Sequence, residues 1–156
     1  MLTIRKATHK DCPGIAEIHT RAVRAIPGNF YPPDAIAQWS IPRALENYQQ
    51  AIDEKEFYVA ERDGVLIGFA VLVSQNPEIE AVYVSPEAKG EGVGAKLLSK
   101  LEERARDLGL KVLRLNASLN AVAFYQRAGF RALEESTYRL ATGFEIRCVP
   151  MIKELG

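Results

Sequence analysis

Three glycines spaced two residues apart carry the most distinctive chemistry of the sequence: Gly90, Gly92 and Gly94. An alternating apolar segment, residues 79–85, precedes them, and a segment with helical apolar spacing follows as far as Gly109. Glycine lets the backbone turn tightly and point several N–H groups one way, and a helix N-terminus adds partial positive charge. The pattern favours a site for a diphosphate, although a tight turn without a ligand explains it equally well.

Gly90, Gly92 and Ala95 also match the dinucleotide fingerprint G-x-G-x-x-G/A. Three features disfavour a NAD(P)-dependent oxidoreductase. Four residues separate the strand from the first glycine, Arg114 and Asn116 occupy the end of the next strand in place of an acidic residue, and hairpin-linked strands precede the motif. A P-loop is excluded because no Gly-Lys-Ser or Gly-Lys-Thr follows the glycines.

Two segments resemble signatures of the GNAT superfamily of acyl-CoA-dependent N-acyltransferases. Residues 89–94, Lys-Gly-Glu-Gly-Val-Gly, are similar to the family's pyrophosphate signature, with Lys89 where Arg or Gln is usual. Residues 120–130 are similar to a later signature that begins with Asn, continues through Ala and Phe-Tyr, and ends with Gly-Phe. Residues 4–8 and 151–155 also resemble that family's first and last strands, so the resemblance covers essentially the whole chain.

The resemblance implies acetyl-CoA, or a related acyl-CoA, as a co-substrate without a metal. Backbone amides would hold its diphosphate, and its pantetheine would pair along the preceding strand, with the N–H of Val82 facing the thioester oxygen. Asn120 is expected to cap the following helix and to contact the cofactor, and Asn116 is either a pantetheine contact or a strand-end turn residue. The expected cofactor-binding residues are Val82, Tyr83, Val84, Lys89, Gly90, Glu91, Gly92, Val93, Gly94, Ala95, Asn116, Asn120, Ala123 and Tyr125.

Transfer of an acyl group to an amine needs a base and an acid, because the ammonium loses a proton and the departing thiolate gains one. Glu80, which alternation places on the face of Val82, is the first candidate base, and Glu78 is the second. Tyr125 matches the tyrosine that protonates the thiolate in many members of the family. Solvated carboxylates and a core aromatic residue are the plain alternatives for these positions.

The acceptor is expected to be a small molecule or a peptide with a primary amine. Polyamines, aminoglycoside-like compounds, amino acids and protein N-termini all remain open. Four aromatic residues are candidates for the acceptor side, with simple packing as the alternative for each: Phe30, Tyr31, Trp39 and Tyr138. A non-catalytic acyl-CoA-binding module on the same fold is the alternative function, and a homodimer is common among similar proteins.

Composition describes an ordinary globular chain. The 156 residues favour one N-acetyltransferase-like domain over 1–156, and 20 basic and 20 acidic residues give a net charge of zero, which suggests neither a nucleic-acid nor a membrane partner. The two cysteines, Cys12 and Cys148, suit free buried thiols. His9 and His19 fit no zinc spacing, and a surface position is expected for both. Without an N-terminal signal segment, the protein is expected in the cytoplasm.

The elements that must position these residues follow from periodicity. Apolar spacing predicts the order β α α β β β α β α β β, with a further short helix possible over residues 44–52. The predicted strand at residues 79–85 has Ile79, Ala81 and Tyr83 on one face. The fold class is therefore α+β, a mostly antiparallel twisted sheet of about six or seven strands flanked by about four helices.

Overall fold

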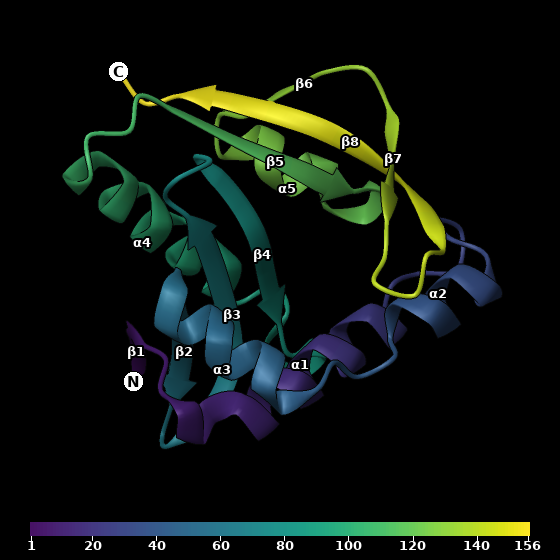
Figure 1. Cartoon of the computed structure of the whole chain (residues 1–156), viewed down its shortest axis with the longest axis horizontal. Helices are drawn as coiled ribbons and strands as arrows, with labels where there is room; N and C mark the ends of the chain where they lie inside the picture. Colours follow the sequence, from purple (N-terminus) through teal and green to yellow (C-terminus); the bar gives the residue numbers. More distant parts are fainter.

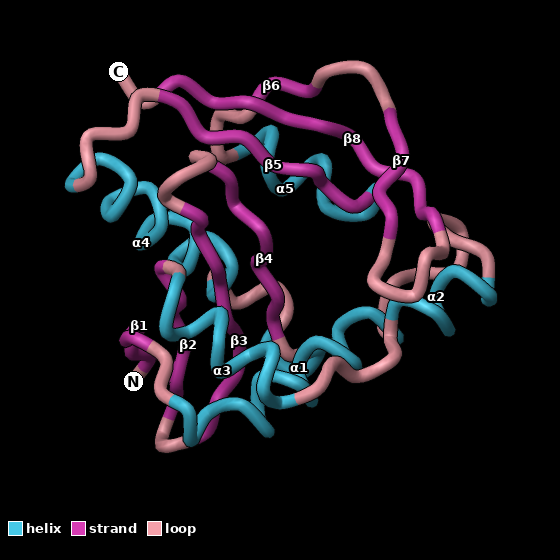
Figure 2. Tube along the Cα trace, viewed as in Figure 1, coloured by secondary structure: helices cyan, strands magenta, loops and turns pink.

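A twisted sheet with helices against both of its faces organises the protein (Figures 1 and 2). The computed structural model describes all residues from 1 to 156. The strands are β1 Leu2–Lys6, β2 Glu56–Arg62, β3 Val65–Val73, β4 Glu78–Val84, β5 Val112–Ser118, β6 Arg131–Ala132, β7 Ser136–Arg139 and β8 Glu145–Glu154. The α-helices are α1 Cys12–Arg24, α2 Pro33–Trp39, α3 Leu45–Glu54, α4 Val93–Asp107 and α5 Val122–Arg127. None of the five α-helices combines the length and the apolar composition of a membrane-spanning segment.

The strand order is β1-β2-β3-β4-β5-β8-β6, with β7 also paired to β8. All pairs are antiparallel except β4 with β5, so the predicted α+β, mostly antiparallel sheet is confirmed. The chain has five α-helices and eight strands, a helix and a strand more than the predicted order contains. The additional helix is α3, and the additional strand arises because the segment from 130 to 140, which is the penultimate strand of the predicted order, divides into β6 and β7. Pro150 of β8 faces this break and has no N–H to donate to it.

A β-bulge in β4 changes which side chains share a face. Val71 of β3 lies opposite Ala81, but the next residue of β3, Leu72, lies opposite Ile79, so Glu80 is an extra residue. Ile79 therefore packs in the same cluster as Leu72, while Ala81 packs against the cluster on the other face. The prediction that Ile79 and Ala81 share a face is wrong, since strict alternation does not survive an inserted residue.

Hydrogen bonding between β4 and β5 is short. Only Glu78 and Ile79 are in register with Arg114 and Leu115, and beyond this point the two strands separate, as Figure 2 shows. The bulge at Glu80 begins where the pairing ends. Beyond this pairing, the main-chain N–H and C=O groups along the facing edges of β4 and β5 have no hydrogen-bond partner on a neighbouring strand.

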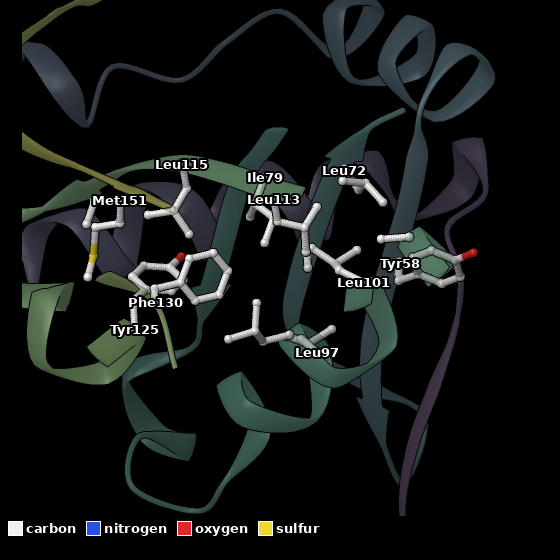
Figure 3. Packing of buried hydrophobic residues seen from close by; sticks show 14 of the residues in the cluster. Tyr58, Leu72, Ile79, Leu97, Leu101, Leu113, Leu115, Tyr125, Phe130 and Met151 are labelled. Carbon is white, nitrogen blue, oxygen red and sulfur yellow. The ribbon is translucent and has the colours of Figure 1, made fainter. Parts of the chain in front are cut away.

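Two apolar clusters fix the helices on the two faces of the sheet. The larger one joins α4 and α5 to the sheet: Leu97 and Leu101 pack toward Leu72 and Ile79, as Figure 3 shows. The smaller one packs α1 and α3 against β2 and β3. Because α4 follows the glycines and α5 carries Tyr125, the larger cluster sets the position of both candidate elements.

Candidate active site

The glycine loop presents a row of unpaired main-chain donors. Gly90 and Gly92 adopt positive φ angles of +83° and +81°, which glycine accepts without strain, and Gly92 is the left-handed residue before α4. The first backbone bond of the helix region comes from Lys96, which donates to the Gly92 carbonyl at 3.1 Å. The amides that donate to no backbone carbonyl are those of Gly90, Gly92, Val93, Gly94 and Ala95. Together with the N-terminus of a 15-residue helix, these amides have the arrangement that an anion site requires.

The space above the loop is open at two of the three glycines. A Cβ atom built on Gly90 or Gly92 would meet no other atom within 4 Å. A Cβ on Gly94 would lie 3.2 Å from the ring of Phe124, so this glycine allows α4 to approach α5. The motif therefore combines two positions that border free space with one position that serves packing.

Except for Val93, the side chains beside the loop are charged or exposed. Glu91 forms an ion pair with Arg62 of β2, and Lys89 and Ala95 are exposed. The side chain of Val93 is 1% exposed and belongs to the larger apolar cluster, so only its amide can meet a ligand. The loop thus offers a ligand mainly backbone groups.

The side chains of β4, the strand before the loop, point to both faces of the sheet. Val82 and Val84 are half-buried against the larger cluster. Tyr83 points to the opposite face, where its ring meets the edge of His19 with 5.0 Å between ring centroids. His19 is buried, contrary to the expected surface position; burial lowers its pKa to about 4, and its Nδ1 atom has no hydrogen-bond partner. No group of three or more His, Cys, Asp or Glu side chains gathers where a metal ion could bind.

Helix α5 places Tyr125 beneath β5 and β8 (Figure 3). The Tyr125 side chain is buried and contacts the rings of Phe124 and Phe130 edge-on, at 5.0 and 5.7 Å between ring centroids. Burial raises the pKa of Tyr125, and the charge of a Tyr83 phenolate would raise it further. Tyr125 is therefore a neutral phenol at neutral pH. Ala123, on the same helix, is exposed.

Asn120 lies in a short 3₁₀ turn, Leu119–Ala121, before α5. The residue that caps α5 is Ala121, without a side-chain bond, so the prediction that Asn120 caps this helix is wrong. Instead, the Oδ1 atom of Asn120 is buried and has no hydrogen-bond partner. A buried acceptor without a donor costs free energy unless something else satisfies it.

The two candidate bases have different surroundings. Glu80 accepts two hydrogen bonds from the Nζ atom of Lys55, at 2.7 and 3.0 Å. Glu78 is half-buried and forms no ion pair; burial raises its pKa, and the negative charge of Glu80 raises it further. Of the two carboxylates, Glu78 is the one without a cation bound to it.

A cavity of about 400 Å³ lies where β4 and β5 begin to separate, and Glu78 and Asn116 border it. Its lining residues are Asn76, Pro77, Glu78, Arg114, Leu115, Asn116, Leu133, Pro150 and Met151. Sequence reasoning did not assign Arg114 or Leu133 to a site, because the lining comes from four separate segments. One pattern in the sequence could have indicated this face of β5: leucines at 113 and 115 alternate with Arg114 and Asn116. In the structure these leucines are buried and the two polar residues are exposed.

The four predicted acceptor aromatics lie elsewhere, and none of them borders this cavity. Tyr31 is 4% exposed; its hydroxyl donates to the Arg147 carbonyl at 2.7 Å and accepts from the Leu119 amide at 2.9 Å. Trp39 packs edge-on against Tyr31, and Phe30 joins the same small cluster. Tyr138 lies on β7 and is 48% exposed.

Residues 29–155 match the acetyltransferase (GNAT) domain family. The chain belongs to this family. A relative named L-amino acid N-acyltransferase MnaT, from Escherichia coli strain K12, is 34% identical over 123 residues, which are 72% of this chain and 67% of the relative. An uncharacterized N-acetyltransferase of Methanocaldococcus jannaschii is 27% identical over 144 residues, 85% of this chain, and the chain spans only 62% of its length.

Solved structures share the fold along the whole chain. A GCN5-related N-acetyltransferase from Rhodopseudomonas palustris superposes with a TM-score of 0.91 at 24% identity, covering 97% of this chain and 94% of its own. A putative acetyltransferase from Salmonella typhimurium, solved with acetyl-CoA, gives a TM-score of 0.75 at 25% identity and covers 100% of this chain and 95% of its own.

Proposed function

We propose that this member of the GNAT acetyltransferase family transfers an acetyl group from acetyl-CoA to a primary amine, by direct attack while both substrates are bound. The observation that carries the proposal is the row of five unpaired amides around open space at Gly90 and Gly92. This row borders the end of β4, a strand that has lost its β5 neighbour. The similar Salmonella typhimurium protein, solved with acetyl-CoA, supports this donor.

On the donor side, the amides from Gly90 to Ala95 bind the diphosphate, and the N-terminus of α4 adds its partial positive charge. The exposed ammonium of Lys89 lies beside them and attracts the same anion. Val82, Tyr83 and Val84 offer their free strand edge to the pantetheine amides. On the far side, the turn that holds Asn120 and the exposed Ala123 face the ligand.

The bulge supplies the oxyanion donor. In a strand, successive amides point alternately to the two neighbours, and in a bulge two successive residues, here Glu80 and Ala81, face the same partner, β3. Beyond Ile79, the next amide directed toward the β5 side is therefore that of Val82. We assign it to the thioester oxygen, which gains negative charge as the amine attacks.

Two proton carriers complete the reaction. Glu78, with its raised pKa and no bound cation, accepts a proton from the ammonium, either directly or through water. The amine nitrogen then attacks the thioester carbon and a C–N bond forms. As the C–S bond breaks, the nitrogen releases its second proton to water, which leaves a neutral amide. The sulfur takes its proton from the hydroxyl of Tyr125, and water returns a proton to the Tyr125 oxygen. Glu80 ranks below Glu78 as the base because Lys55 already neutralises it.

A covalent intermediate on the enzyme is not part of this proposal. Cys12 and Cys148 are both buried, and burial raises the pKa of each thiol, which disfavours the thiolate that a nucleophile needs. Direct attack within a ternary complex requires no such group.

The test is a thiol-release assay with acetyl-CoA and a panel of primary amines, followed by mass spectrometry of the amines. We expect release of CoA that depends on an amine and a product heavier by one acetyl group. Tight binding of acetyl-CoA with no turnover on any amine would instead favour a non-catalytic acyl-CoA-binding module. Absence of binding would remove the donor assignment as well.

A further inference from the structure

The cavity at the start of the β4–β5 separation contains opposite charges that do not neutralise each other. Glu78 and Arg114 are partners in the parallel register, which places their side chains side by side on one face of the sheet. Nevertheless, no carboxylate lies within 4.0 Å of the Arg114 guanidinium. By contrast, Arg104 binds Glu56 at 2.9 Å, and Arg147 binds Glu135 through two hydrogen bonds. Both charges of the cavity are therefore available to a ligand.

The rest of the lining contains both polar and apolar residues. Asn76 and Asn116 are its uncharged polar residues. Leu133, from the segment after β6, and Pro150 of β8 form an apolar wall. A ligand with a compact pair of opposite charges and an apolar substituent matches this distribution.

We propose that the acceptor is an α-amino acid with an apolar side chain, and that Arg114 is the specificity-determining residue that binds its carboxylate. The inference rests on the proposed function and names the substrate class for the same site. A guanidinium binds a carboxylate with two parallel hydrogen bonds and fixes its orientation. With the carboxylate on Arg114, the ammonium on the adjacent carbon is directed toward Glu78, the proposed base, and the side chain meets the apolar wall.

The same arrangement disfavours other amine classes. A polyamine or an aminoglycoside has several cations and no carboxylate, so Arg114 would repel it and gain no partner. A peptide N-terminus has an amide in place of the free carboxylate, which removes the charge that Arg114 recognises. Selectivity should therefore depend on the carboxylate more than on the identity of the side chain.

The decisive assay uses matched acceptors that differ only at the carboxylate: leucine, leucinamide and 3-methylbutylamine, and the corresponding set from phenylalanine. We expect kcat/KM to be at least about 30-fold higher for the amino acids, since a hydrogen-bonded charge pair of this kind has such an effect. Equal kcat/KM across each set would overturn this inference and leave the acetyltransferase proposal intact. No thiol release with any acceptor would overturn the proposed function, and this inference with it.

Variants of Arg114 test whether this residue causes the selectivity for the carboxylate. In Arg114→Gln, kcat/KM for leucine should fall about 30-fold while the value for 3-methylbutylamine stays the same or rises; Arg114→Lys should recover part of the loss. The control is Arg131→Gln, on β6, an exposed arginine that does not border the cavity. A parallel fall for both acceptors in Arg114→Gln, or an equal loss of selectivity in Arg131→Gln, would contradict the assignment.

Discussion

The proposed donor site and the proposed acceptor cavity of this protein are built from different chemical groups. The proposed donor site consists of main-chain amides from one continuous segment, residues 90–95. The proposed acceptor cavity consists of side chains from the start of β4, from β5 and β8, and from the segment after β6. A main-chain site depends on a local backbone conformation, which glycine spacing encodes directly. A side-chain site depends on strand register, which no single segment encodes.

The largest expected effect tests the main-chain site. Gly92→Arg should weaken acetyl-CoA binding by about 100-fold or more, because the new side chain enters the open space above the loop and several charge-assisted hydrogen bonds are lost. Calorimetric titration of the variant with CoA measures the change.

A glycine beyond the C-terminal end of α4 provides the control. Gly109 follows the other end of the same helix, has a φ angle of +77° and also borders open space, so Gly109→Arg imposes the same backbone strain far from the loop. Its CoA affinity should match that of the unmodified protein. If both variants lose affinity equally, the loss reflects a damaged helix, and the loop would no longer be distinguished as the donor site.

The two carboxylates of β4 test the side-chain site. Glu78→Gln should lower kcat by about 100-fold, whereas Glu80→Gln should change it only a few-fold, since Lys55 already neutralises Glu80. The folded protein disfavours the charge on Glu78, so Glu78→Gln should be no less stable at neutral pH. Steady-state rates and thermal unfolding of the two variants decide between the carboxylates, and the reverse order of rates would make Glu80 the base.

The pH dependence of the activity should shift in a defined direction. A base works only when it is deprotonated, and the pKa of Glu78 is raised, so activity should fall with falling pH at a higher pH than for an ordinary glutamate. Repulsion from Glu80 contributes to that rise, so Glu80→Gln should move this limb to lower pH. If this limb does not move in Glu80→Gln, the charge of Glu80 does not influence the pKa of the catalytic base.

The fold and the backbone of the glycine loop could be predicted because their signals are local. Hairpin turns, helical spacing and the glycines each lie within a few residues, and the glycine loop has the predicted conformation. The bulge at Glu80 could not be predicted. One inserted residue does not change the composition of the strand, yet it places Ile79 on the opposite face of the sheet. The cavity could not be predicted from the sequence for a related reason. Arg114 and Leu133 line the same cavity only because β5, β6 and β8 pair in a particular register.

The effect of a change at Tyr125 should be intermediate. Tyr125→Phe removes the proposed proton donor and should lower kcat by about tenfold, less than loss of the base, since a thiolate is a stable leaving group. The affinity for CoA should stay nearly constant, because the ring still packs between Phe124 and Phe130. Stopped-flow single-turnover rates combined with CoA titration measure both quantities, and an unchanged rate would exclude the tyrosine from the mechanism.

The smallest expected effect on catalysis concerns an aromatic residue that the sequence associated with the acceptor. The hydroxyl of Tyr31 joins the Arg147 carbonyl of β8 to the Leu119 amide before α5, so Tyr31→Phe leaves two buried main-chain groups without a partner. Its free energy of unfolding should fall by about 1–3 kcal/mol, while kcat/KM for the acceptor changes little. Urea denaturation and acceptor kinetics on the same preparation give both values. A large rise in KM for the acceptor with normal stability would place Tyr31 in the acceptor site, and the acceptor side would then extend well beyond the cavity at Arg114.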